Sequence, residues 1–69
     1  MSRLELLGQN IAQQRKRKGL SQEKLAEIVD LSREYITRVE RGQKNISLKK
    51  LFLIADTLEM KLNDLINFD

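Results

Sequence analysis

The sequence contains no cysteine, no histidine, no proline and no tryptophan. Without cysteine a disulfide is impossible, and without cysteine or histidine the usual ligands of a structural zinc ion are missing. The same absences exclude a thiolate nucleophile, an imidazole base and a Ser-His-Asp triad. We therefore do not expect an enzyme, and we expect no metal and no other cofactor.

The chain is also short. Its 69 residues allow a single domain, residues 1–69, and a domain of this size buries only about 60% of the surface of its unfolded chain. Such a core supplies roughly 3–5 kcal/mol of stability. With disulfides and zinc excluded, association with a second copy is the remaining way to stabilise it.

Long apolar stretches are absent as well. No run approaches the roughly 18–20 residues of a membrane span, and the N-terminus lacks the basic-then-apolar layout of a secretory signal. Apolar residues make up 41% of the chain and charged residues 33%, a mixture typical of folded soluble domains. We expect a cytoplasmic protein without a membrane partner.

The charges are unevenly distributed along the chain. Residues 1–50 carry 12 Lys and Arg against 6 Asp and Glu, whereas residues 51–69 carry 1 Lys against 4 acidic residues. A basic body with an acidic, apolar tail indicates two surfaces with different partners. The basic surface is either a nucleic-acid interface or ordinary solvated charge.

Serine and glycine divide the chain into helical segments. Serine, a preferred N-cap residue, precedes four helical patterns, and glycine follows two of them. No segment has the alternation of a strand, so we predict an all-α bundle of five short helices. The expected helices cover about residues 3–18, 22–29, 33–41, 48–58 and 62–67. The residues expected to face inward are Leu4, Leu7, Ile11, Ala12, Leu25, Ala26, Val29, Ile36, Val39, Leu48, Leu51, Phe52, Ala55 and Leu58.

Two charged residues interrupt these inward faces. Arg15 lies on the apolar stripe of the first helix, and Glu40 lies beside Val39 on the inward side of the third. A charge that faces a core needs a partner, because removing an unpaired ion from water costs on the order of several kcal/mol. We predict an ion pair between Arg15 and Glu40. In the alternative, both lie at the edge of the stripe and extend into water.

Residues 21–41 have the organisation of a helix-turn-helix unit. Two short helices are joined by a turn of three to four residues, and the small Ala26 lies where the helices must approach closely. The segment RKRKGLSQEKLAEIVDLSREYITRVERGQKNISL, which starts at Arg15, resembles the Xre family, the class of the lambda and 434 phage repressors, and the resemblance extends over about residues 7–66. It implies a lambda-repressor-like domain of five helices whose third helix enters the DNA major groove.

Within that class, REYITRVERGQKNISL (residues 33–48) is similar to the controller proteins of restriction–modification systems, which are short dimers that regulate their own promoter. Asp30 departs from the family pattern, which usually has a left-handed glycine at this turn. Aspartate either adopts the positive φ at a cost of roughly 1 kcal/mol or indicates a slightly different turn.

The outward face of the third helix holds the expected base readers. Arg33 is the main one, because arginine bonds the O6 and N7 edges of guanine in a bidentate way. Glu34 either accepts from the cytosine amino group or repels phosphate and so orients Arg33. Thr37 is expected to pack on a thymine methyl, and Arg38 to read a base or hold the backbone. The alternative for these residues is a solvated helix face.

A second set is expected to hold the DNA backbone. Gln22 begins a helix whose free N–H groups favour a phosphate, and the resemblance implies that contact; otherwise it is only a helix starter. The resemblance places Lys44 and Asn45 at phosphates too, although Asn45 alternatively only shapes the turn. Tyr35 either contacts DNA, as the resemblance implies, or packs beside the second helix with its hydroxyl group exposed to solvent. The remaining cations expected near phosphate are Arg41 and Arg17.

The apolar tail offers a dimerisation surface. Dimers of this class place two recognition helices about 34 Å apart, so the operator should be a pseudo-palindrome. We predict an interface formed by the last helix, about residues 61–68, and the end of the fourth; the alternative is a monomer that buries these side chains itself. The predicted interface residues are Leu53, Met60, Leu62, Ile66 and Phe68.

The sequence as a whole predicts a homodimeric, sequence-specific transcriptional regulator that binds double-stranded DNA, with a restriction–modification controller as the particular type. The alternative is an antitoxin that binds a toxin protein as well as DNA. A contact with RNA polymerase, the operator sequence, and activation versus repression are left open by the sequence.

Overall fold

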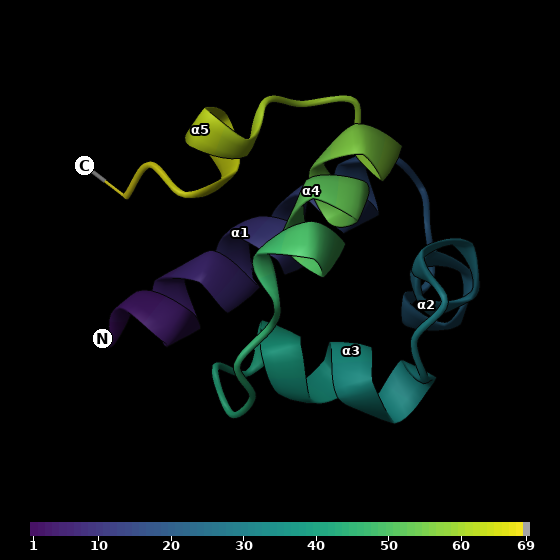
Figure 1. Cartoon of the computed structure of the whole chain (residues 1–69), viewed down its shortest axis with the longest axis horizontal. Helices are drawn as coiled ribbons and strands as arrows, with labels where there is room; N and C mark the ends of the chain where they lie inside the picture. The colour runs from purple at the N-terminus through teal and green to yellow at the C-terminus, as the bar shows by residue number, and fades with distance from the viewer. Residues whose placement is uncertain (69) are drawn as a thin grey trace.

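The computed structural model describes residues 1–68, which form five α-helices and no strand (Figure 1). The all-α prediction is therefore confirmed for this part of the chain. None of these helices is long and apolar enough to cross a membrane. Asp69, the last residue of the expected single domain, lies outside the described residues. The helices are α1 (Arg3–Arg17), α2 (Gln22–Val29), α3 (Arg33–Glu40), α4 (Leu48–Thr57) and α5 (Leu62–Leu65).

Local capping explains where the first four helices begin. The serine before each of them accepts a hydrogen bond from the backbone N–H three residues later, at 3.0–3.2 Å. At α1 the Glu5 carboxylate also accepts from the Ser2 N–H at 3.0 Å, which completes a capping box. Helix α5 has no side-chain cap at Lys61 and ends at Leu65, two residues earlier than predicted.

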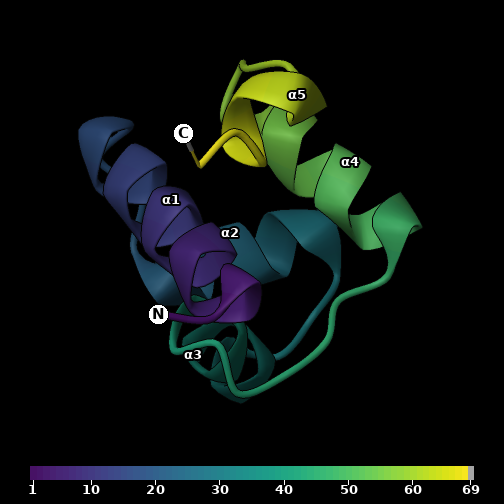
Figure 2. The same ribbon diagram turned by 90° about the vertical axis from the view of Figure 1, so that its left-hand side faces the viewer.

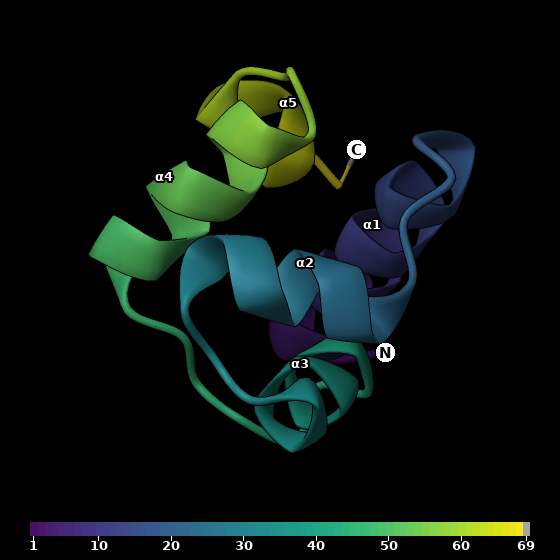
Figure 3. The same cartoon turned by 90° about the vertical axis from the view of Figure 1, so that its right-hand side faces the viewer.

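The helices α3 and α5 lie at opposite ends of the molecule. In each of the three views, α3 lies at the lower edge and α5 at the upper edge (Figures 1, 2 and 3). Helix α2 packs against α3 and α4, while α1 packs against α3 and α5. This arrangement leaves the outer side of α3 uncovered by the other helices.

The core joins apolar residues from all five helices. The prediction that Leu48 and Phe52 of α4 belong to the core is wrong. Leu48 is 62% exposed and Phe52 is 48% exposed, because α4 turns Ile54 inward instead. Leu4, in the first turn of α1, is also exposed. The buried apolar residues are Leu7, Ile11, Leu25, Ala26, Val29, Ile36, Val39, Leu51, Ile54, Ala55, Leu58 and Leu65.

Gly8 allows α1 to approach the end of α3. A Cβ atom built on Gly8 would overlap the backbone carbonyl oxygens of Val39 and Glu40. Only a residue without a side chain fits there, because the atoms it would meet belong to the backbone and cannot rotate away. This close approach fixes the distance between α1 and the C-terminal end of α3.

The turn between α2 and α3 is left-handed at Asp30. Its backbone has φ 58° and ψ 51°, so aspartate adopts the conformation for which the family usually has glycine. The Nζ of Lys50 donates to the carbonyl oxygen of Val29 at 2.7 Å and thereby satisfies one of the free carbonyls at the end of α2. A side chain from α4 therefore supports the turn.

Candidate nucleic-acid interface

The outer face of α3 carries the polar side chains of the candidate site. Arg33, Glu34 and Arg38 are exposed, while Thr37 is half-buried. A surface hollow of about 460 Å³ lies between the start of α2 and α3. It is lined by Gln22, Arg33, Glu34, Thr37 and Arg41. The structure therefore brings five of the residues that sequence reasoning assigned to DNA into one place.

A buried ion pair lies directly behind this hollow. The Nε of Arg15 donates to Oε2 of Glu40 at 2.7 Å and Nη2 donates to Oε1 at 3.1 Å, with side chains 8% and 6% exposed. The third guanidinium nitrogen, Nη1, donates to the carbonyl of Leu20 at 2.7 Å. Both charges are thus paired and hydrogen-bonded, as buried charges require. The alternative, in which both extend into water, is wrong.

Gln22 connects the ion pair to the hollow. Its Nε2 donates to Oε1 of Glu40 at 2.9 Å, and its Oε1 accepts from the Thr37 hydroxyl at 2.9 Å. Gln22 is therefore more than a helix starter. Sequence reasoning missed this connection, because its partners lie 18 and 15 residues away and no spacing rule relates them.

Tyr35 braces the loop that follows α3. Its hydroxyl donates to the carbonyl oxygen of Asn45 at 2.8 Å, in an exposed position, so Tyr35 has a structural partner that the sequence did not predict. The Nζ of Lys44 lies 5.5 Å from the centre of the Tyr35 ring, within range of a cation–π contact. The loop residues that sequence reasoning assigned to phosphates are thereby held against α3.

Glu34 pairs with Arg38. Its Oε1 lies 2.9 Å from Nη2 of Arg38, one helical turn away, and both side chains are largely exposed. An exposed pair at this spacing contributes only a few tenths of a kcal/mol, roughly 0.3–0.5. In this structure, therefore, the ion-pair partner of Glu34 is Arg38, on the same face of α3.

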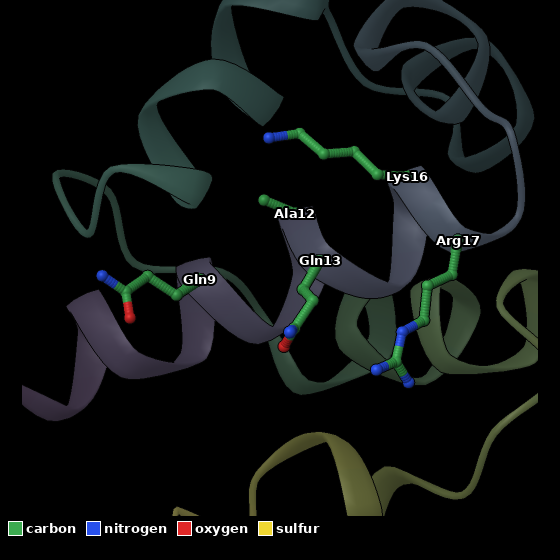
Figure 4. A pocket seen from close by; sticks show the side chains of 5 residues that line it. All are labelled: Gln9, Ala12, Gln13, Lys16 and Arg17. Carbon is green, nitrogen blue, oxygen red and sulfur yellow. The ribbon is translucent and has the colours of Figure 1, made fainter.

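Arg17 lies apart from the α3 hollow. It lines a separate hollow of about 640 Å³ together with Gln9, Ala12, Gln13 and Lys16, all of them on α1. In Figure 4 the Arg17 side chain extends from α1 toward the side of the picture that holds α5. The structure does not bring Arg17 together with the other expected backbone contacts.

The expected dimer residues divide into two groups. Leu53 and Ile66 are exposed, whereas Met60, Leu62 and Phe68 are half-buried and pack against the core. Leu48 and Phe52 of α4, which were predicted to face the core, add further exposed apolar surface on that helix. The described part of the chain therefore leaves apolar side chains uncovered on α4 and after α5.

Two crossed short helices, with a charged second helix held outward at the surface, define the helix-turn-helix class. The helix-turn-helix family profile matches residues 11–65, and the chain belongs to this Xre-type family. The chain is 44% identical over 64 residues to control protein C.BamHI of Bacillus amyloliquefaciens, covering 91% of this chain and 79% of that protein.

Two solved structures extend the comparison. The controller protein C.AhdI of Aeromonas hydrophila has a TM-score of 0.85 and 42% identity, with 90% of this chain and 94% of that chain covered. The biofilm master regulator SinR, solved in complex with DNA, has a TM-score of 0.82 and 32% identity, with 88% and 98% covered. The five-helix, lambda-repressor-like architecture predicted from the sequence is confirmed by these matches.

Proposed function

We propose that this protein is a homodimeric, sequence-specific transcriptional regulator that binds a pseudo-palindromic operator with α3 in the major groove. The observation that carries the proposal is the α3 hollow, which is lined by Arg33, Thr37 and Arg41 of the third-helix region and by Gln22 at the start of α2. The relatives of the chain support this function, since they include restriction–modification controllers and a regulator solved with DNA.

Arg33 is the main base reader in this proposal. It is the first residue of α3, and the early residues of a recognition helix reach deepest into the groove. Its exposed guanidinium is a donor fork that matches guanine O6 and N7. Glu34 and Arg38 complete the outer face, and their mutual ion pair must open if either is to contact a base.

Backbone contacts surround the base readers. Gln22 has one Nε2 hydrogen committed to Glu40, and its second hydrogen is available for a phosphate oxygen at the start of α2. Lys44 and Asn45 lie in the loop after α3, which Tyr35 of α3 braces, and Arg41 lines the hollow. These groups hold the helix in register and carry little sequence information.

The proposed dimer surface is the exposed apolar side of α4 and the segment after α5. Ile66 and Leu53 are its exposed members among the predicted residues, and the exposed Phe52 precedes Leu53 on α4. A domain this small gains stability from covering them with a second copy. Similarity to C.BamHI and C.AhdI supports a restriction–modification controller as the particular type of regulator.

Binding-site selection from random duplex DNA tests the proposal. The wild type should recover an inverted repeat, and Arg33→Ala should lose the preference for one guanine in each half-site, at a cost of about 1–3 kcal/mol. Lys44→Ala is the contrasting variant: it should weaken binding to all sequences without changing the recovered repeat. A wild-type selection that enriches no sequence contradicts the proposal.

A further inference from the structure

The hydrogen bonds from Arg15 to Thr37 have a fixed direction. The guanidinium of Arg15 can only donate and the carboxylate of Glu40 can only accept. Gln22 must therefore turn its Nε2, the donor, toward Glu40, since its carbonyl oxygen would meet another acceptor there. The Gln22 Oε1 is left facing Thr37, where it can only accept.

This direction determines where the Thr37 hydroxyl proton lies. Both groups within reach of Oγ1 are acceptors: Gln22 Oε1 at 2.9 Å and the Arg33 carbonyl oxygen at 3.0 Å. A threonine hydroxyl has one proton, and here that proton is committed to the protein. Toward the open hollow, Oγ1 therefore offers lone pairs only.

We infer that Thr37 determines specificity by accepting a hydrogen bond from the amino group of an adenine or a cytosine in the major groove. Only adenine N6 and cytosine N4 donate there, whereas guanine O6 and thymine O4 are acceptors that would face the lone pairs of Oγ1. This inference rests on the proposed function. It replaces the expected contact between the Thr37 methyl group and a thymine.

The position of the amino group follows from the helix geometry. Thr37 lies four residues, about 6 Å along the helix axis, after Arg33 on the same face of α3. Successive bases are about 3.4 Å apart along one strand. The selected adenine or cytosine should therefore lie within about two base pairs of the guanine assigned to Arg33.

Two substitutions separate the hydroxyl from the methyl group. Thr37→Val keeps the shape and loses the hydroxyl, whereas Thr37→Ser keeps the hydroxyl and loses the methyl group. In binding-site selection, Thr37→Ser should retain the adenine or cytosine preference, and Thr37→Val should lose about three- to tenfold of it, the range for one neutral hydrogen bond. If Thr37→Val retains the preference, the inference is wrong, even where the wild type still selects an inverted repeat.

Methylated bases provide the direct chemical test. N6-methyladenine or N4-methylcytosine at the selected position replaces the exposed amino hydrogen with a methyl group, and the two analogues distinguish the two bases. The wild type should bind the methylated duplex about three- to tenfold more weakly, while Thr37→Val should bind both duplexes equally. Undiminished wild-type binding to the methylated duplex overturns the inference, and failure of the wild type to select any site overturns the proposed function instead.

Discussion

Arg15 and Glu40 form a buried bidentate ion pair, with Nε of Arg15 2.7 Å from Oε2 of Glu40 and Nη2 of Arg15 3.1 Å from Oε1 of Glu40. The pair joins the last turn of α1 to the last residue of α3. Glu40 also accepts from Gln22, at the start of α2, so three helices meet at one carboxylate. The orientation of α3 relative to the rest of the domain depends on this junction.

Removing one partner of this pair should be costly. Arg15→Met leaves the Glu40 carboxylate buried without its charge partner, which typically costs roughly 3–5 kcal/mol. The double variant Arg15→Met/Glu40→Leu removes both charges and should recover most of that loss, since apolar replacements of buried pairs are often neutral. Urea unfolding at fixed protein concentration measures both; an Arg15→Met variant as stable as the wild type contradicts the structure.

Gly8 and Gly19 provide a matched test of packing. Gly8→Ala should destabilise the domain by about 2–3 kcal/mol, because its Cβ would overlap the carbonyls of Val39 and Glu40. Gly19→Ala meets no atom within 4 Å and should cost only about 1 kcal/mol, from its positive φ of 71°. Thermal unfolding compares them. If Gly8→Ala is stabilising, as helix propensity alone predicts, α1 does not approach α3 this closely.

The serine caps and the helix-turn-helix unit could be predicted because they depend on neighbours three to four residues apart. The face of α4 could not, since apolar residues such as Leu48, Phe52 and Leu53 surround the helix and periodicity selects no single stripe. The hydrogen bond between Gln22 and Thr37 likewise could not be predicted from the sequence, because it depends on how α2 crosses α3. The base-reader and dimer assignments stay predictions.

The dimer surface can be tested with one charged substitution and its control. Ile66→Asp should shift the protein to a monomer, because it places a carboxylate in the proposed apolar interface. Ile28→Asp is matched in chemistry and exposure, 49% against 42%, but lies on α2 outside that interface, so it should leave the dimer intact. Sedimentation equilibrium at micromolar concentrations distinguishes them, and equal behaviour of the two variants argues against this surface.

The contact between Lys18 and Glu59 should be visible in a pH titration. Lys18 Nζ lies 2.8 Å from Glu59 Oε1, and its hydrogen bond and charge lower the pKa of Glu59 from its usual 4.5. Because the folded-state pKa is lowered, the stabilisation is present above pH 4.5 and is lost as the pH falls through the folded-state value.

Lys18→Met should therefore raise the pKa of Glu59 toward 4.5, as measured by NMR titration of the carboxyl groups. The pKa of Glu5, which is lowered by hydrogen bonds from the backbone and side chain of Ser2, serves as the control in the same spectra and should not move. An unchanged Glu59 titration would mean that the two side chains do not pair in solution.

The central claim, that α3 reads DNA in the major groove, is tested most directly by dimethyl sulfate protection of the selected duplex. This reagent methylates guanine N7 in the major groove and adenine N3 in the minor groove. We expect the wild type to protect one guanine N7 in each half-site, with half-sites about 34 Å apart, and Arg33→Ala to lose that protection while still occupying the site at higher concentration. Protection confined to adenine N3, or guanine protection that survives Arg33→Ala, would contradict the account.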